Sequence, residues 1–182
     1  LDKPGYTIKK VDGVPNTDVL AGLLKTDGIG IMFGTGPGKG GALATFNPNT
    51  NAITFDVSFL DSPSEVLAVL LAHEATHYLW DVDYNRYLSG AITKPALGTP
   101  PSGTVAIRSP NSIDQEYRSI IAMSQVWYQF KQEKPNQNKG LADSQLDGWT
   151  QNVLKADGTL VFENEAKEKV RQAYADKKLP EY

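Results

Sequence analysis

The sequence predicts an α+β fold, in which a small mixed or antiparallel sheet packs against helices. Extended runs with β-branched and aromatic residues occupy Ile29–Phe33, Ala42–Phe46 and Ala52–Phe59. Two segments with capping signals and apolar residues at three-and-four spacing follow, beginning at Pro63 and Ile113. The N-terminal third of the chain therefore looks mixed, and the two capped segments follow it.

Length and composition indicate one globular domain. At 182 residues, with 40% hydrophobic and 21% charged residues, the chain is long enough to bury a core without disulfide or metal staples. We expect a single domain over residues 1–182, with a core at about residues 29–132 and a C-terminal helical part at residues 141–182. Nothing in the sequence predicts an oligomeric state.

Charge and hydropathy narrow the range of partners. The formal net charge is −3 and the 18 basic residues are scattered, which disfavours nucleic acid and anionic membranes as partners. The longest apolar run, Val66–Ala72, is too short to span a membrane. Because residue 1 is Leu and not Met, we expect a processed or trimmed chain, and a secreted or cell-envelope bacterial protein is our expectation for its location.

Turn and cap residues indicate the other elements of the N-terminal half. Thr7–Val11 is expected to form a short strand. Thr17 or Asp18 is expected to cap a helix that runs through Leu24 to a stop at Gly28. The sequence NPNTN between the second and third extended runs is rich in turn formers, and it predicts a hairpin.

A glycine-rich segment, GTGPGKGG, follows the first extended run. Glycine loops expose backbone N–H groups that bind phosphate, and Lys39 would suit a phosphate contact. The spacing argues against this function, because only three residues separate Gly34 from Gly38 where the motif needs four, and glycine follows the lysine. We therefore interpret the segment as a flexible, hairpin-like connection between Phe33 and Ala42.

Capping signals mark the start of both central helices. A capping box over residues 62–65 includes Pro63, a residue favoured at the first helical position, so a helix should begin there. A second capping box over residues 112–115 predicts a helix from Ile113 to about Gln132.

The segments beyond these helices are assigned in the same way. Asp83–Asn111 is rich in Gly, Pro, Ser and Thr, so we expect a long irregular excursion, and such loops are often functional. Two more helices are expected at Asp143–Leu154 and Glu163–Asp176, separated by an Asp157-Gly158 turn.

Both histidines of the chain lie four residues apart around a glutamate, in the stretch LAHEATHYLWD. His73, Glu74 and His77 match the pattern H-E-x-x-H, which on a helix puts two imidazoles on one face with a carboxylate beside them. The histidines continue the inward-facing stripe of this helix, where polar groups need partners. Since the chain has no cysteine, His, Asp and Glu are its only strong metal ligands. The pattern therefore predicts a zinc (Zn²⁺) site.

The stretch VLLAHEATHYLWD, preceded by an extended strand, resembles the active-site helix of zincin metallopeptidases over roughly residues 52–128. The resemblance implies a zincin-like fold, with the sheet packed on the active-site helix and on a second, ligand-bearing helix. It also implies that His73 and His77 bind zinc and that Glu74 polarises the attacking water. The third ligand divides the zincins into subfamilies.

Three carboxylates compete for the third ligand position. Glu116 begins the sequence EYRS, which resembles the gluzincin pattern of Glu followed three residues on by a small residue. Asp114, with Tyr117 three residues later, resembles part of the aspzincin pattern without its flanking Gly-Thr and final Gly. Asp83 lies at the metzincin position, but Trp80 replaces the glycine that turns the chain there. We favour Glu116, because it shares an apolar helix stripe and a rigid helix can hold a ligand in fixed geometry.

Supporting groups are less well defined by the sequence. Ile120 stands where gluzincins often place an Asp beside a ligand histidine, so Asp81, four residues beyond His77, is the candidate for that contact. A solvated Asp at a helix end is an equal alternative for this residue. The candidates for stabilising an oxyanion, by proximity in sequence, are Tyr84, Arg86, Tyr87 and Tyr117.

The resemblance implies a hydrolase, a gluzincin-like metallopeptidase that cleaves peptide or protein substrates. Zinc held by His73, His77 and Glu116 would lower the pKa of its water to about 7, and Glu74 would carry the proton from water to the leaving amine. The third extended run is expected to be the sheet edge along which a peptide aligns. Two alternatives stay open, namely a zinc-binding but catalytically inactive binding or assembly module and a structural domain without metal.

Overall fold

The computed structural model describes residues 28–35, 43–62, 64–91, 93, 110–133, 135 and 142–175. At positions 65, 81, 83, 84, 110–112, 142–145, 174 and 175 the backbone alone is described. The strand and the helix predicted at residues 7–11 and 17–24 lie outside these ranges.

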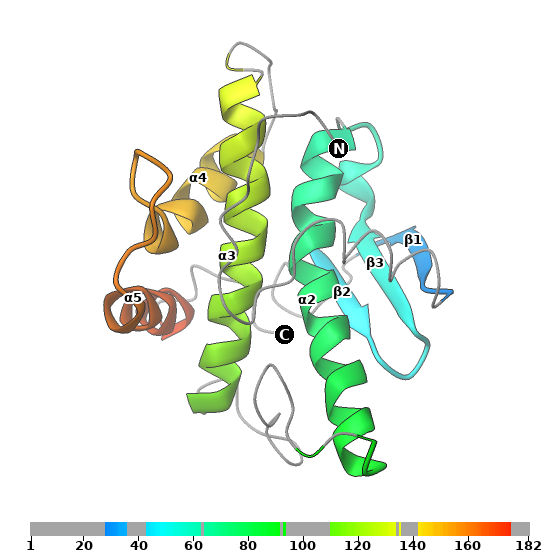
Figure 1. The fold of residues 1–182 in the computed structure, drawn as a ribbon. Helices are drawn as coiled ribbons and strands as arrows, with labels where there is room; N and C mark the ends of the chain where they lie inside the picture. Colours follow the sequence, from blue (N-terminus) through cyan, green and yellow to red (C-terminus); the bar gives the residue numbers. More distant parts are fainter. Residues whose placement is uncertain are drawn as a thin grey trace.

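The described residues form a mixed α and β structure, as predicted, with a three-stranded sheet, one short 3-10 helix and four α-helices. In chain order the elements are β1 (Gly30–Gly34), β2 (Ala44–Asn47), β3 (Ala52–Asp56), η1 (Val57–Phe59), α2 (Ser64–Leu88), α3 (Pro110–Glu133), α4 (Ala142–Val153) and α5 (Glu163–Ala175). Figure 1 shows the sheet on one side of the α2–α3 pair, with α4 and α5 on the other. Within the described part of the chain, no helix has the length and apolar character that a membrane crossing needs.

The sheet has the strand order β1-β3-β2, with β1 parallel and β2 antiparallel to β3. The predicted hairpin between β2 and β3 is confirmed, and Asn51 in its turn has φ 48°, a left-handed conformation that asparagine tolerates. The prediction that β3 is a sheet edge is wrong, because β3 lies in the centre. The hairpin-like interpretation of the glycine-rich segment is also wrong, because β3 separates β1 from β2.

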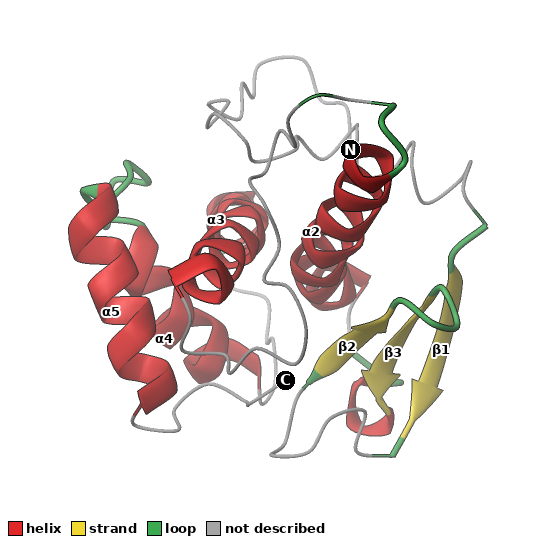
Figure 2. Ribbon diagram, turned by 90° about the horizontal axis from the view of Figure 1, so that it is seen from below, coloured by secondary structure: helices red, strands yellow, loops and turns green. Residues whose placement is uncertain are grey.

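A continuous hydrophobic core joins the sheet to the helices. The side chains of Ile53 and Phe55 in β3 are buried in this core together with Val66 and Val69 of α2. Full burial of such a side chain contributes about 1.5–3 kcal/mol, which exceeds what the short strands gain from propensity alone. The core therefore fixes the position of the sheet beside α2, as Figure 2 shows.

Helix α2 carries the H-E-x-x-H pattern near its middle and is longer than predicted. Its predicted first residue, Pro63, lies outside the described residues, and the described helix begins at the next residue. The prediction that an irregular excursion starts at Asp83 is wrong, because the helix continues to Leu88. Among the described residues, Trp80 is the last buried apolar side chain of the helix, so the inward-facing stripe ends earlier than the helix itself and underestimates its length.

The end of α2 is a Schellman motif. Gly90 has φ 74°, its N–H donates to the carbonyl of Tyr87, and the N–H of Ala91 donates to the carbonyl of Arg86. A residue with a Cβ is strained at this φ, so glycine marks the point where the helix stops.

Helix α3 begins at Pro110, before the predicted start at Ile113. The prediction that Ser112 caps this helix is wrong, since residue 112 is already helical. Proline suits the first helical position because its φ is preset and its missing N–H would have no partner there. The helix ends at Glu133, which confirms the predicted end near Gln132.

Helices α2 and α3 run antiparallel and lie side by side, as Figures 1 and 2 show. Ala72 and Ala75 of α2 form a small apolar cluster with Val126 of α3. Small side chains at such a contact let two helices approach closely. The close approach brings polar groups of the two helices within reach of one another.

Helices α4 and α5 cover the side of α3 that faces away from α2, and they confirm the predicted helices 143–154 and 163–176 to within about one residue. Trp127 of α3 donates its Nε1–H to Asp147 Oδ1 of α4 at 2.7 Å. Lys131 donates to both oxygens of the same carboxylate, at 2.7 and 2.6 Å. Buried apolar side chains of this layer are Leu146, Val153, Ala166 and Val170.

The predicted turn at Asp157-Gly158 is confirmed and is packed against α3. Gly158 has φ 78°, and Asp157 Oδ1 accepts hydrogen bonds from the backbone N–H of Thr159 at 2.9 Å and from its hydroxyl at 2.6 Å. A Cβ at Gly158 would lie 2.6 Å from Cε1 of Tyr128. The turn therefore needs glycine both for its backbone conformation and for its contact.

We predict that Gly158→Ala lowers the free energy of unfolding by about 2–4 kcal/mol, the sum of a strained φ and an overpacked contact. Gly148→Ala is the matched control, because Gly148 is an exposed position in α4 with no heavy atom within 4 Å of an added Cβ. This control should stabilise the protein by about 0.5–1 kcal/mol. Urea unfolding of both variants measures the difference, and equal effects of the two substitutions would contradict the packing described for the turn.

Candidate metal centre

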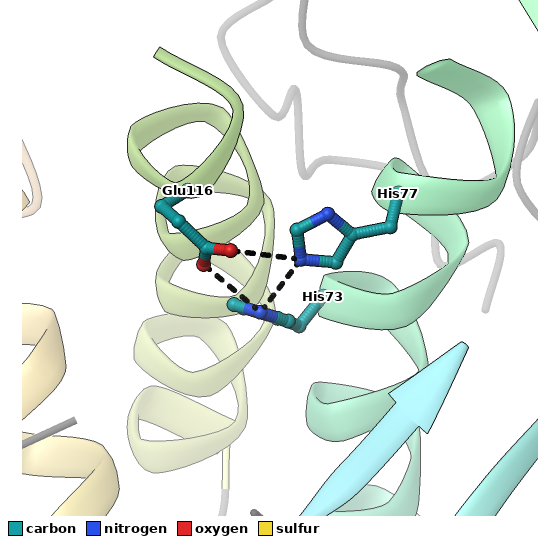
Figure 3. A group of neighbouring side chains, drawn as sticks. All are labelled: His73, His77 and Glu116. Atoms are coloured by element: carbon teal, nitrogen blue, oxygen red, sulfur yellow. Dashed lines mark hydrogen bonds and ion pairs between the residues drawn. The ribbon is translucent and has the colours of Figure 1, made fainter. Parts of the chain in front are cut away.

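Helix α2 presents two imidazoles on the side that faces α3. His73 and His77 are four residues apart, so they lie one above the other on one helix face. Their rings are 4.9 Å apart between centroids and nearly perpendicular, at 64°. Their Nε2 atoms are 3.1 Å apart, and both point toward α3, as Figure 3 shows.

Helix α3 contributes a carboxylate to the same point. Glu116 is only 5% exposed and shares its helix face with the buried residues Ile120, Met123 and Trp127. One of its oxygens lies 3.5 Å from Nε2 of His73, and the other lies 3.5 Å from Nε2 of His77. One nitrogen or oxygen atom from each of the three residues can be chosen so that all lie within 4.8 Å of one another.

The two imidazoles can share one proton across the 3.1 Å between their Nε2 atoms, whereas two protons there would collide. Glu116 adds a carboxylate oxygen 3.5 Å from each of these nitrogens, so three groups with lone pairs face one point. A cation at the centre satisfies the lone pairs of all three groups at once.

The spacing of the three groups fits a tetrahedral zinc site. Two atoms bound at zinc's usual distance, about 2.0–2.1 Å, and at tetrahedral angles lie about 3.3 Å from each other. The Nε2–Nε2 separation of 3.1 Å and the Nε2–O separations of 3.5 Å, each of which goes to a different oxygen of Glu116, lie on either side of that value. Two imidazoles and one carboxylate also make up one of the ligand sets of catalytic zinc sites, which leave a fourth position open.

Burial keeps both histidines in the form that binds metal. Burial lowers the pKa of His77 from 6.5 to about 4. Burial, and secondarily the neighbouring His77, lowers the pKa of His73 well below its usual value. Since the neutral imidazole is the metal ligand, neither group has to lose a proton at neutral pH before it binds a cation.

Glu74 lies beside the cluster and is almost completely buried, at 2% exposure. Burial, and then the nearby Glu116 carboxylate, raises the pKa of Glu74 to about 8, while a hydrogen bond from the main-chain N–H of Phe46 lowers it. Among the described residues, its Oε2 atom has no hydrogen-bond partner. A cation between the two carboxylates would favour their charged forms, because an opposite charge stabilises an ionised acid.

The other two candidates for the third ligand are placed differently by the structure. The carboxylate of Asp114 pairs with Lys167 of α5 at 2.6 Å, on a different side of α3 from Glu116. The metzincin arrangement needs a sharp turn at Trp80, but α2 continues without interruption through this residue. The side chain of Asp83 lies outside the described residues. Of the candidate side chains that the structure describes, Glu116 is therefore the one that lies beside the two histidines.

Of the five side chains proposed for supporting roles, the structure describes those of Tyr117, Arg86 and Tyr87. The side chains of Asp81 and Tyr84 lie outside the described residues. Tyr117 packs away from the cluster, with its ring 5.5 Å from Lys167 Nζ. Arg86 and Tyr87 are exposed residues in the last turn of α2, about 13–15 Å along the helix axis from His77. Ile120 is buried in the core, so no carboxylate occupies that position.

Phe46 is the residue at this site that the sequence analysis missed. Its contribution is a main-chain N–H group, which every residue except proline has, so no residue type signals it. The pairing of β2 with β3 and the position of β2 beside α2 create the contact, and neither is encoded locally.

Comparison of the chain with protein-family models, with curated proteins and with solved structures finds no match. A metal centre at this cluster is therefore supported by its side-chain geometry and by the motif alone.

We predict that metal-free protein loses stability as pH rises from 6.5 to 8, and that Glu74→Gln removes this loss. Between pH 4.5 and about 8, folded Glu74 holds a proton that the unfolded chain releases, so each pH unit costs up to about 1.4 kcal/mol. The two histidines act in the opposite direction, because the unfolded chain holds their protons, and this effect fades as pH rises above 6.5. Because both histidines are present in the wild type and in Glu74→Gln, the difference between the two proteins reports Glu74 alone.

Urea unfolding with a chelator at several pH values from 6.5 to 8 measures this effect. The wild type should lose about 2 kcal/mol relative to Glu74→Gln across the range. Glu133→Gln, which alters an exposed carboxylate at the end of α3, should show the same pH dependence of the free energy of unfolding as the wild type. If the free energy of unfolding changes equally with pH in the wild type and in Glu74→Gln, this result would contradict a buried, protonated Glu74.

Proposed function

We propose that the protein is a zinc-dependent metallopeptidase of gluzincin type that hydrolyses peptide bonds. The observation that carries this proposal is the convergence of the Nε2 atoms of His73 and His77 with the Glu116 carboxylate. The buried Glu74, next to this cluster in sequence and in space, supports hydrolysis over simple metal binding. The mixed α and β arrangement, with the sheet beside the motif helix, agrees with a zincin-like fold.

In this proposal His73, His77 and Glu116 hold the zinc ion. Zinc, when bound, supplies Lewis acidity that polarises a carbonyl group and acidifies water. Two neutral imidazoles and one carboxylate leave a net charge of about +1 on such a centre, and this charge favours the anionic transition state of amide hydrolysis.

Glu74 acts as the general base and then as the general acid. Its Oε2, which has no hydrogen-bond partner among the described residues, accepts a proton as water attacks the peptide carbonyl. The same carboxyl group then delivers the proton to the leaving amine. Its burial limits exchange of this proton with bulk water, because the group is only 2% exposed.

The strand that aligns the substrate is reassigned from β3 to β2. A central strand has no free edge, and β3 has neighbours on both sides. β2 lies at the edge of the three-stranded sheet and beside α2, as Figure 2 shows. An extended peptide that pairs with the outward main-chain groups of β2 other than the Phe46 N–H, which Glu74 accepts, would therefore run past the motif helix.

A zinc-binding protein without turnover is the second candidate. Two observations favour it: buried Ile120 stands where gluzincins often carry a supporting Asp, and Tyr117 points away from the cluster. Such a protein would keep the metal and the fold but would stabilise no oxyanion.

We predict that Glu74→Gln retains zinc and the fold but loses at least about 100-fold in kcat, because the variant cannot carry the proton. Hydrolysis of a fluorogenic peptide library by zinc-loaded protein measures activity, and metal analysis measures zinc. Glu133→Gln is the control and should keep wild-type activity. Chelation should abolish activity and added zinc should restore it. Near-normal activity of Glu74→Gln would contradict the mechanism, whereas zinc-loaded wild type without turnover would favour the second candidate.

A further inference from the structure

The hydrogen-bond pattern of the β2–β3 ladder shows which way the amide of Phe46 points. Asp56 donates its N–H to the carbonyl of Leu43 at 2.9 Å, so these two residues form a hydrogen-bonded pair. Pairs in an antiparallel ladder alternate between hydrogen-bonded and non-hydrogen-bonded, and Phe46 is opposite Ile53, three positions further along. Phe46 is therefore in a non-hydrogen-bonded pair, and its N–H and C=O point away from β3.

The outward N–H of Phe46 meets the motif helix. It donates a hydrogen bond to the carboxylate of Glu74, which lies in α2 beside this edge of the sheet. The other oxygen of that carboxylate, Oε2, has no hydrogen-bond partner among the described residues. One oxygen is thus held by the main chain, and the other is left to exchange a proton.

The ring of Phe46 makes a second contact with the same helix. It packs edge-on against Tyr78, with the ring centroids 5.5 Å apart. Tyr78 lies four residues after Glu74, on the same face of α2. Residue 46 is therefore joined to α2 by its amide and by its side chain, and it is joined to the sheet by the pairing of β2 with β3.

We propose that the main-chain amide of Phe46 is a positioning group that fixes the orientation of the Glu74 carboxylate. This inference rests on the proposed peptidase function. A glutamate has three side-chain torsions, and a general base must be held in place for efficient proton transfer. A donor on a strand that is itself held by its neighbour keeps the carboxylate from rotating.

Substitutions at residue 46 separate the amide from the ring. Phe46→Ala and Phe46→Pro both lose the ring, but only proline also loses the N–H. Proline is tolerated in an edge strand where the N–H points away from the sheet. Phe46→Pro should therefore have a kcat about 10–100-fold below that of Phe46→Ala. The KM values of the two variants should agree within about twofold, and so should their zinc affinities.

A second variant tests the role of the Phe46 N–H even if Phe46→Pro does not fold. Incorporation of the α-hydroxy analogue of phenylalanine at position 46 replaces the amide N–H by an ester oxygen and keeps the ring. It should lose kcat relative to the wild type, again at equal zinc affinity. Equal kcat for Phe46→Pro and Phe46→Ala, together with wild-type kcat for the ester, would overturn the positioning role.

Amide hydrogen exchange tests the contact without any activity. The Phe46 amide should exchange slowly in the wild type and in Glu74→Gln, whose side-chain oxygen still accepts, and quickly in Glu74→Ala. The amide of Ala44, the other outward-facing amide of β2, serves as the reference in all three proteins. Exchange at Phe46 that is insensitive to Glu74→Ala would overturn the inference. If zinc-loaded wild type hydrolyses no peptide, this result contradicts the proposed function and the catalytic part of the inference. The exchange rate of the Phe46 amide would still show whether the contact with Glu74 exists.

Discussion

The burial of three lone-pair donors at one point between two helices is the constraint on which the site depends. His73 and Glu116 are buried and His77 is largely so, and their ligand atoms approach to 3.1 and 3.5 Å. Removing polar groups from water costs free energy that their partners must offset, and truncating one member of a buried pair typically costs about 3–5 kcal/mol. A shared cation would be a further partner for all three groups, so metal affinity and folding stability should be coupled in this protein.

The remainder of the fold holds α2 and α3 in the register that this convergence needs. On one side, Ile53 and Phe55 pack the sheet against the start of α2. On the other side, α4 and α5 cover α3, and Asp147 accepts hydrogen bonds from Trp127 and Lys131. Each of the two helices is therefore held by its own outer layer, and the contact between α2 and α3 sets how their residues align. A rigid frame of this kind is what preorganised chemistry requires, because displacements of about 1 Å are costly for catalysis.

The sequence predicts which three side chains come together, because the signals for them are local. The spacing of His73 and His77 fixes their common helix face, and the apolar stripe around Glu116 predicts that this carboxylate points inward, whereas Asp114 lies about 200° away on the same helix. Long-range features were not predictable in this way. The insertion of β3 between β1 and β2 is a tertiary choice, since neighbouring strands in sequence pair only about two-thirds of the time. The start of α3 at Pro110, three residues before the predicted Ile113, shows that the capping box over residues 112–115 does not mark the first residue of this helix.

The central claim, that His73, His77 and Glu116 hold one zinc ion, is tested most directly by zinc titration of the wild type beside Glu116→Ala and Asp114→Ala. The wild type should bind one zinc per chain. Removal of a group that only hydrogen-bonds to a metal ligand costs up to roughly 100-fold in metal affinity. Glu116→Ala removes a ligand itself, so its zinc affinity should fall by more than that. Asp114→Ala should bind zinc as the wild type does, since Asp114 pairs with Lys167 of α5. Unchanged affinity in Glu116→Ala, or a collapse of affinity in Asp114→Ala, would contradict the account.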